Sequence, residues 1–193
     1  MASILVVCTG NVCRSPIAEG MVRSALEARL GEAAPVVASA GTAGWEGSTA
    51  MPEAVVAASE RGVDISAHAA RRLLAEHVRA ADVVLAMATE HRDEVARSVP
   101  DARDRVFTLK ELVRLLEALP PDDPAGSLSE RVHAAATLRR SGFNGNPYDE
   151  DVFDPLGLPL DCYRAIAWEL HGWCGRLVDG LVGSASAART MEA

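Results

Sequence analysis

Short apolar runs alternate along the chain with longer stretches in which apolar residues recur at helical spacing. The apolar runs, which are expected to be strands, occupy residues 3–8, 36–40, 82–87 and 106–107. The stretches with helical spacing predict helices at about 15–30, 52–60, 71–76, 90–97, 110–119 and 160–181. This alternation predicts an α/β fold, a three-layer sandwich around a four-stranded parallel sheet.

The chain has 193 residues, which is the length of one ordinary domain. We expect this single domain to span residues 1–182, and the Ala- and Ser-rich residues 183–193 to form a flexible tail. A segment rich in Pro and Gly at about 120–151 departs from the pattern and contains one expected helix, at 128–140. We interpret it as a loop-rich insertion that could act as a lid, as a docking surface or as a disordered spacer.

Acidic residues outnumber basic ones by 27 to 19, so the chain carries a formal net charge of −8 at pH 7. This charge disfavours broad binding to nucleic acid or to anionic membranes. The sequence has neither a membrane-length apolar run nor the pattern of a signal peptide, so we expect a cytoplasmic protein. In a reducing compartment its four cysteines are expected to be catalytic or buried thiols.

The strongest functional pattern lies between the first strand and the first helix. Cys8 and Arg14 are separated by five residues, Thr-Gly-Asn-Val-Cys, and Ser15-Pro16 is predicted to open the helix with Ser15 as its N-cap. Backbone N–H groups of such a loop can surround a tetrahedral anion, while a guanidinium binds two of its oxygens. The same positive potential favours a thiolate at Cys8. The spacing therefore predicts a nucleophilic cysteine beneath a bound phosphate group.

The run Val7–Pro16, together with Asp154-Pro155 late in the chain, resembles the low-molecular-weight protein tyrosine phosphatase family of the bacterial type. Further matches are Ser39-Ala40-Gly41-Thr42, Ser66-Ala67-His68 and residues 82–87. The likeness covers about residues 3–119 and 152–181. It implies a phosphotyrosine phosphatase I-like fold.

The resemblance implies a two-step hydrolysis that uses no metal ion and no other cofactor. Cys8 would attack phosphorus and form a phosphocysteine, and Arg14 would bind the phosphate and its transition state. Asp154 would protonate the leaving oxygen and then activate water. The expected substrate is phosphotyrosine in a protein, with inorganic phosphate as the product or an inhibitor.

The resemblance also assigns supporting residues. The rest of the phosphate-binding loop would be Thr9, Gly10, Asn11, Val12, Cys13 and Ser15. Ser39 and His68 would orient this loop from outside, and Trp45 would form a wall of the substrate pocket. Val12, which is small and apolar, suits an aromatic leaving group.

Two departures from the family pattern leave the substrate open. Family members carry aromatic residues after the Asp-Pro pair, whereas this chain has Leu156-Gly157-Leu158. Bacterial relatives with glycine in this region act on phosphoarginine, so that substrate is an alternative to phosphotyrosine. Phe153 or Tyr148 could replace the missing aromatic wall. The insertion at 120–151 is the second departure.

Other interpretations of the loop fit this sequence less well. A thioredoxin-coupled arsenate reductase needs two mid-chain cysteines, and this chain has none between Arg14 and Asp161. A phosphocysteine carrier protein of sugar transport would not need Arg14 and Asp154 together. A non-catalytic phosphate-binding module would keep the loop for recognition alone, and turnover would exclude it.

The remaining reactive or charged groups receive simpler interpretations. Cys8 and Cys13 could form a reversible disulfide that protects Cys8 from over-oxidation. Cys162 and Cys174, in the last helix, are expected to be core residues. The acidic cluster Asp149-Glu150-Asp151 is interpreted as a solvated charge run.

Overall fold

The computed structural model describes residues 2–120, 126–143, 146 and 148–183. Its strands are β1 (Ser3–Cys8), β2 (Val36–Gly41), β3 (Val83–Ala86) and β4 (Val106–Thr108). They form a four-stranded parallel sheet in the order β2-β1-β3-β4, which confirms the predicted α/β sheet. Of the expected flexible tail, only Gly183 lies within the described residues.

Seven α-helices are present in this part of the chain. They are α1 (Arg14–Leu30), α2 (Pro52–Ser59), α3 (Ala75–Ala80), α4 (Thr89–Ser98), α5 (Leu109–Glu117), α6 (Leu128–Arg140) and α7 (Leu160–Val182). Short 3-10 helices follow α1 and α4, η1 at Gly31–Ala33 and η2 at Pro100–Arg105. None of the described helices is long and apolar enough to cross a membrane.

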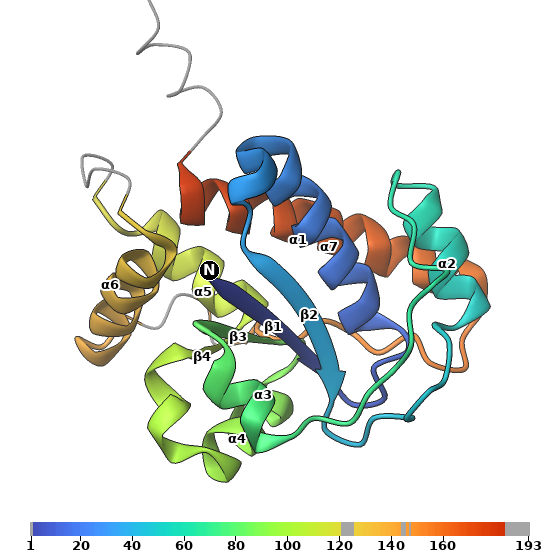
Figure 1. Ribbon diagram of the computed structural model, residues 1–193, viewed down its shortest axis with the longest axis horizontal. Coiled ribbons are helices and arrows are strands. Elements are labelled where there is room, and N and C mark those ends of the chain that lie inside the picture. The colour runs from blue at the N-terminus through green and yellow to red at the C-terminus, as the bar shows by residue number, and fades with distance from the viewer. Residues whose placement is uncertain (1, 121–125, 144–145, 147, 184–193) are drawn as a thin grey trace, which may run out of the picture.

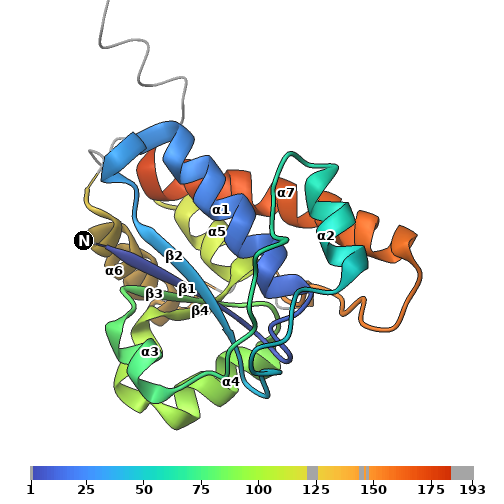
Figure 2. The ribbon, with the colours of Figure 1, turned by 45° about the vertical axis from the view of Figure 1, so that its right-hand side comes forward.

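The sheet separates two apolar cores. Helices α1, α2, α5 and α7 cover one face, and α3 and α4 cover the other (Figures 1 and 2). Strand β1 contributes to both cores because successive side chains of a strand point to opposite faces. Ile4, Val6 and Cys8 belong to the larger core, whereas Leu5 and Val7 belong to the smaller one. The continuous apolar run in β1 thus follows from its central, doubly covered position.

The insertion contains the helix expected at 128–140. Its buried side chains, Leu128, Val132, Ala135 and Ala136, join the larger apolar core. A Ser127–Glu130 capping box fixes its first turn, with the Ser127 hydroxyl accepting from the Glu130 amide. The described part of the insertion therefore packs on the domain, which does not fit its interpretation as a disordered spacer.

Two local predictions were wrong. The helix expected at 71–76 begins only at Ala75, because residues 71–73 are extended and hydrogen-bond Gly41 at the end of β2. Ser15 does not cap α1: Cys13 occupies the N-cap position, and the Ser15 side chain lies buried inside the first turn.

Two helical glycines give a matched test of the packing between α1 and the segment that follows α2. A Cβ atom on Gly20 would lie 2.5 Å from Val63 Cγ1, whereas a Cβ on Gly172 of α7 would meet nothing within 4 Å. Overpacking of this kind costs roughly 1–3 kcal/mol. Replacing a helical glycine with Ala also gains up to about 1 kcal/mol through helix propensity. We therefore expect Gly172→Ala to raise the free energy of unfolding by up to this amount, and Gly20→Ala to lower it by up to about 2 kcal/mol, the packing cost less the same gain. Urea unfolding of both variants measures the difference, and equal effects would contradict the packing described.

Candidate active site

The loop between β1 and α1 turns its carbonyl groups outward. Each carbonyl oxygen from Cys8 to Cys13 accepts a hydrogen bond from a group outside the loop's centre. The donors are, in order, the amides of Thr42, Ala43 and Trp45, the His68 ring, and the amides of Met51 and Ile17. With the carbonyls held outward, the loop's N–H groups face its concave side, where an anion would bind.

Asn11 makes the sharp turn of this loop. Its φ of 58° is the left-handed conformation, which Asn tolerates better than most residues. Its side-chain oxygen accepts from the Arg71 amide at 2.9 Å, which fixes the orientation of the carboxamide. The Nδ2 group therefore donates to the hydroxyls of Ser15 and Ser39, at 2.9 and 2.8 Å.

This network determines which way the Ser15 hydroxyl points. Ser15 Oγ accepts from Asn11 and lies 2.8 Å from Cys8 Sγ, so its own proton is available to the sulfur. A donated hydrogen bond stabilises a thiolate. The sequence placed Ser15 both in the phosphate-binding loop and at the helix N-cap, and in the structure its side chain faces the Cys8 sulfur and does not cap the helix.

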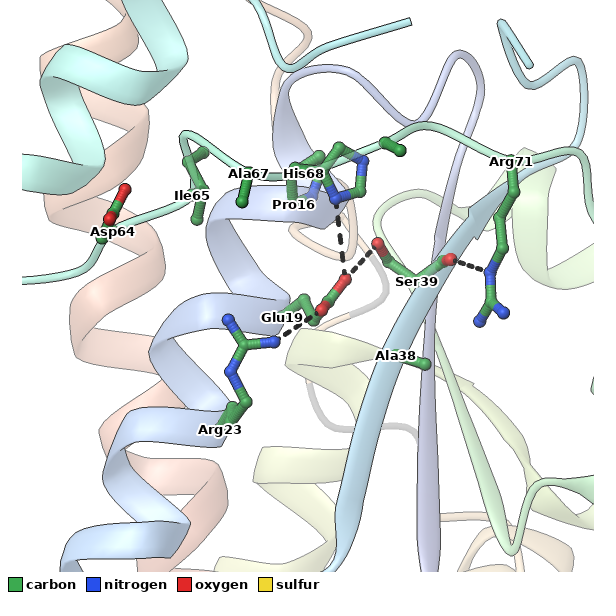
Figure 3. Close-up of a pocket in the computed structure, with 11 residues that line it drawn as sticks. Pro16, Glu19, Arg23, Ala38, Ser39, Asp64, Ile65, Ala67, His68 and Arg71 are labelled. Carbon is green, nitrogen blue, oxygen red and sulfur yellow. Dashed lines mark hydrogen bonds and ion pairs between the residues drawn. The ribbon is translucent and has the colours of Figure 1, made fainter. Parts of the chain in front are cut away.

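Behind the loop lies a second layer of polar groups, drawn in Figure 3. Glu19 Oε2 accepts from the Ser39 hydroxyl at 2.6 Å and lies 4.0 Å from His68 Nδ1. The Arg71 guanidinium donates to the Ser39 carbonyl at 2.7 Å. These side chains border a cavity of about 390 Å³. Ser39 and His68 are thus where the sequence placed them, and Glu19 and Arg71 were missed.

Glu19 had a detectable signal in the sequence. It lies four residues after Ser15, one helical turn along the same face of α1. Arg71 had none, because its contacts depend on the extended segment that replaced the expected helix.

Arg14 and Asp154 form an ion pair across 140 positions of sequence. Arg14 Nη2 donates to Asp154 Oδ2 at 2.5 Å, and Nη1 donates to the Val152 carbonyl at 3.2 Å. The Arg14 side chain is 5% exposed, and its buried Nε has no hydrogen-bond partner among the described residues. This orphaned donor leaves Arg14 able to bind an anion.

A small cavity of about 70 Å³ connects these groups. Its lining consists of Cys8, Thr9, Gly10, Val12, Cys13, Arg14, Trp45, Asp154 and Leu156. The Trp45 ring lies against Gly10, since a Cβ atom there would be 3.6 Å from Trp45 Cε2. The structure thus brings the three predicted catalytic residues and Trp45 to one cavity.

The proposed replacements for the missing aromatic wall do not reach this cavity. Phe153 is 62% exposed and Tyr148 is 98% exposed, and neither lines it. Leu156 occupies that side instead, because the chain turns at Asp154, whose Oδ1 accepts from the Leu156 amide.

His91, on α4, is a site residue that sequence reasoning missed. Its Nε2 lies 2.8 Å from Thr9 Oγ1, and its ring is buried without a partner for Nδ1 among the described residues. Burial and, next, the positive charge of Arg14 lower the pKa of His91. The neutral ring can then accept the Thr9 hydroxyl proton, which ties the loop to α4.

The other cysteines remain free thiols in the structure. Burial raises the pKa of Cys13 to about 11, and its sulfur lies 3.7 Å from the Tyr163 hydroxyl. Cys174 is buried, as expected, but Cys162 is only partly so. A Cys8–Cys13 disulfide stays a prediction.

The comparisons with known proteins agree with this geometry. Residues 3–139 match the family model of low molecular weight phosphotyrosine protein phosphatases. A protein-arginine-phosphatase of Bacillus subtilis is 41% identical, with 87% of this chain and 89% of that protein covered. The low molecular weight protein-tyrosine-phosphatase Etp of Escherichia coli is 36% identical, with 72% and 88% covered.

A solved structure extends the likeness to three dimensions. It is the YwlE arginine phosphatase as a cysteine-to-serine mutant with a phosphorylated active-site serine. Its TM-score is 0.69 at 32% identity, and the match covers 93% of this chain and 95% of that one. The chain belongs to the low molecular weight phosphotyrosine protein phosphatase family. Like the members of that family it is a cysteine-dependent protein phosphatase, a hydrolase.

The buried His91 predicts how stability depends on pH. Its pKa is lowered in the folded state, so below pH 6.5 the unfolded chain binds a proton that the folded chain does not. The wild type should therefore lose stability as pH falls from 7.5 to 5.5, by up to about 1.4 kcal/mol per pH unit for one proton. In His91→Gln the unfolding free energy should fall less steeply over this range.

The exposed His171 of α7 supplies the control. Urea unfolding at several pH values should give His171→Gln the same slope as the wild type. A slope for His91→Gln that equals the wild-type slope would contradict the neutral, buried state of His91.

Proposed function

We propose that this phosphatase hydrolyses phosphotyrosine in protein substrates through a phosphocysteine intermediate on Cys8, without a metal ion. The observation that carries the proposal is the convergence of Cys8, Arg14 and Asp154 on one cavity beneath a loop whose carbonyls all point outward. Loop amides and one guanidinium supply the positive charge that a metal ion supplies in other phosphatases.

In the first step the Cys8 thiolate attacks phosphorus in line with the leaving oxygen. The S–P bond forms as the P–O bond to the tyrosine breaks, and Asp154 gives its proton to the departing phenolate. The loop amides and Arg14 stabilise the charge on the equatorial oxygens. In the second step the Asp154 carboxylate takes a proton from water as that water attacks phosphorus. The S–P bond then breaks, which releases inorganic phosphate and regenerates the thiolate.

The Arg14–Asp154 ion pair fits this sequence of events. A phosphate that takes the Nη2 and Nε donors of Arg14 competes with Asp154 for the guanidinium. Asp154 is 42% exposed, so it can turn from Arg14 toward the leaving oxygen without breaking the core.

The cavity walls favour an aromatic leaving group. Beyond the loop and Asp154, the lining residues are Trp45 and Leu156, and the loop itself presents Val12. These apolar side chains suit the faces of a phenyl ring. A phosphorylated guanidinium, in contrast, carries several N–H donors that need acceptors when they are buried. Among the described residues Asp154 is the only carboxylate that lines the cavity, so this lining suits a phenyl ring better than a guanidinium.

Phosphoarginine is the second candidate substrate. Its support is the extent of similarity: the arginine phosphatase of B. subtilis matches 87% of this chain, against 72% for the tyrosine phosphatase of E. coli. We further propose that the enzyme acts in the cytoplasm, where a reactive thiol such as Cys8 stays reduced.

Initial rates test the mechanism and the substrate together. Without added metal, the wild type should hydrolyse a phosphotyrosine peptide and p-nitrophenyl phosphate, with a bell-shaped pH profile. Cys8→Ser should abolish turnover, and Arg14→Ala should lower kcat by about 10²–10³-fold, the effect of removing a transition-state donor. A higher kcat/KM for a phosphoarginine peptide would favour the second candidate. Phosphate binding with no turnover of any substrate would favour a binding module.

Trp45 should set the preference for the aryl group. We expect Trp45→Ala to lower kcat/KM for the phosphotyrosine peptide about two- to tenfold, given the roughly 0.5–1.5 kcal/mol that an aromatic pair adds. The rate on a phosphorylated alkyl alcohol should change less. Trp168→Ala, which removes an exposed tryptophan of α7, should leave both rates unchanged. Equal losses on aryl and alkyl phosphates would show that Trp45 does not contact the leaving group.

A further inference from the structure

The sequence suggested that the acidic cluster Asp149-Glu150-Asp151 is a solvated charge run, but only Asp149 and Asp151 are exposed, and Glu150 is buried. Asp149 pairs with Lys110 and Arg114, each at 2.7 Å. Glu150 is 7% exposed, accepts from the Thr108 hydroxyl and lies 3.3 Å from Arg114. All three acidic side chains have a partner, since Asp151 accepts from the Thr89 amide at 2.7 Å.

The partners of the cluster lie on the rigid part of the domain. Lys110 and Arg114 belong to α5, Thr108 ends β4, and Thr89 begins α4. These elements follow β3 and β4, so their first residues gather at the carboxyl edge of the sheet, the same edge as Cys8. The cluster therefore fixes the end of the insertion to the edge that carries the catalytic loop.

Lys110, the only lysine of the chain, is the centre of these contacts. Its side chain is 5% exposed, and its ammonium donates to Asp149 at 2.7 Å and to the Asp151 carbonyl at 2.9 Å. A further ion pair at 2.7 Å joins it to Glu169 of α7. The buried Lys110 ammonium keeps its three acceptors only while residues 149–151 stay in this position. Lys110 therefore favours one position of residues 149–151 over others.

The contacts continue to within two residues of the general acid. The Val152 amide donates to the Met87 carbonyl at 2.8 Å, its side chain is buried, and its carbonyl accepts from Arg14. Residues 149–152 are thus held one after another, and Asp154 follows after the exposed Phe153. The position of the Asp154 carboxyl depends on this anchored segment.

We propose that Lys110 and Asp151 are positioning residues that hold Asp154 where it can protonate the leaving group. The proposal rests on the proposed function, because it concerns the proton that Asp154 delivers. If Lys110 or Asp151 is removed, the segment loosens and Asp154 spends less time in reach of the leaving oxygen. Cys8 and Arg14 lie on other elements, at the end of β1 and the start of α1, and keep their places in the loop.

The choice of substrates separates this role from a general loss of structure. Tyrosine is a poor leaving group, with a pKa of about 10 for its phenol, and it needs the proton. The nitrophenolate of p-nitrophenyl phosphate leaves more readily and needs it less. Because the second step is the same for both substrates, the comparison uses kcat/KM, which covers the steps up to release of the leaving group. We expect Lys110→Met and Asp151→Ala to lower kcat/KM for a phosphotyrosine peptide about tenfold or more, and for p-nitrophenyl phosphate no more than about threefold.

Matched variants complete the experiment. Lys110 and Arg176 both lie over the Trp173 ring, at 5.7 and 4.1 Å from its centroid. Arg176→Met removes one of these cations and an ion pair with Glu117, and Arg176 has no hydrogen bond or ion pair with residues 149–154 among the described residues. It should leave the ratio of the two rates unchanged. Asp151→Asn keeps an acceptor for the Thr89 amide and should restore most of the activity lost in Asp151→Ala.

A double-mutant cycle decides the matter. In an Asp154→Ala background, Lys110→Met should have no further effect on either substrate, because there is no general acid left to position. An additional loss in that background, or equal losses on both substrates in the single variants, would overturn the proposal. Turnover that survives in the Cys8→Ser variant would instead overturn the proposed function. The failure of this proposal and the failure of the proposed function can therefore be told apart.

Discussion

The arrangement of the carbonyl groups between Cys8 and Cys13 is the constraint on which the site depends. A loop can surround an anion with N–H groups only if its carbonyls are all turned away, and each of these carbonyls is held by a donor outside it. Asn11 makes the turn this requires, in a left-handed conformation. The segment after β2, which donates to the loop carbonyls, passes so close to its neighbours that glycine is needed at two positions. A Cβ on Gly41 would lie 2.3 Å from the Thr9 carbonyl oxygen, and one on Gly44 would lie 2.3 Å from that of Arg71.

The parallel sheet explains how distant segments meet at this loop. Strands β1, β2 and β3 end at the same edge, so Cys8, the segment after Gly41 and Met87 are neighbours although they are far apart in sequence. The segment that carries Asp154 returns to this edge and is held there by Met87 and by Arg14. Cys8 and Asp154 thus come from distant parts of the chain, and the sheet edge sets the distance between them.

Much of this architecture could be predicted from the sequence because the relevant signals are local. The apolar run of β1 and the Cys8–Arg14 spacing indicated a buried strand followed by an anion-binding loop, and the structure has a buried strand followed by a loop whose carbonyls point outward. Trp45 was also placed correctly beside the cavity. The prediction failed where long-range contacts override local preference: residues 71–73 pair with Gly41 instead of entering a helix, and Ser15 turns toward Cys8 instead of capping one.

The charged residues illustrate the same limit. An acidic run such as 149–151 is usually solvated, and nothing near it in sequence reveals that Lys110 and Arg114 lie opposite. His91 was missed for a similar reason, since its partner Thr9 is 82 positions away. Which charges are buried and paired is decided by the fold, and single-sequence patterns do not carry that information.

The residue that carries phosphate covalently during turnover decides whether Cys8 is the nucleophile. The wild type would be mixed with a phosphotyrosine peptide, quenched in denaturant within the first turnover, digested and analysed by mass spectrometry with fragmentation. We predict one added phosphoryl group on the sulfur of Cys8, formed at the rate of the first step. Continued turnover with Cys8 unmodified throughout, or phosphate on a different residue, would contradict the account.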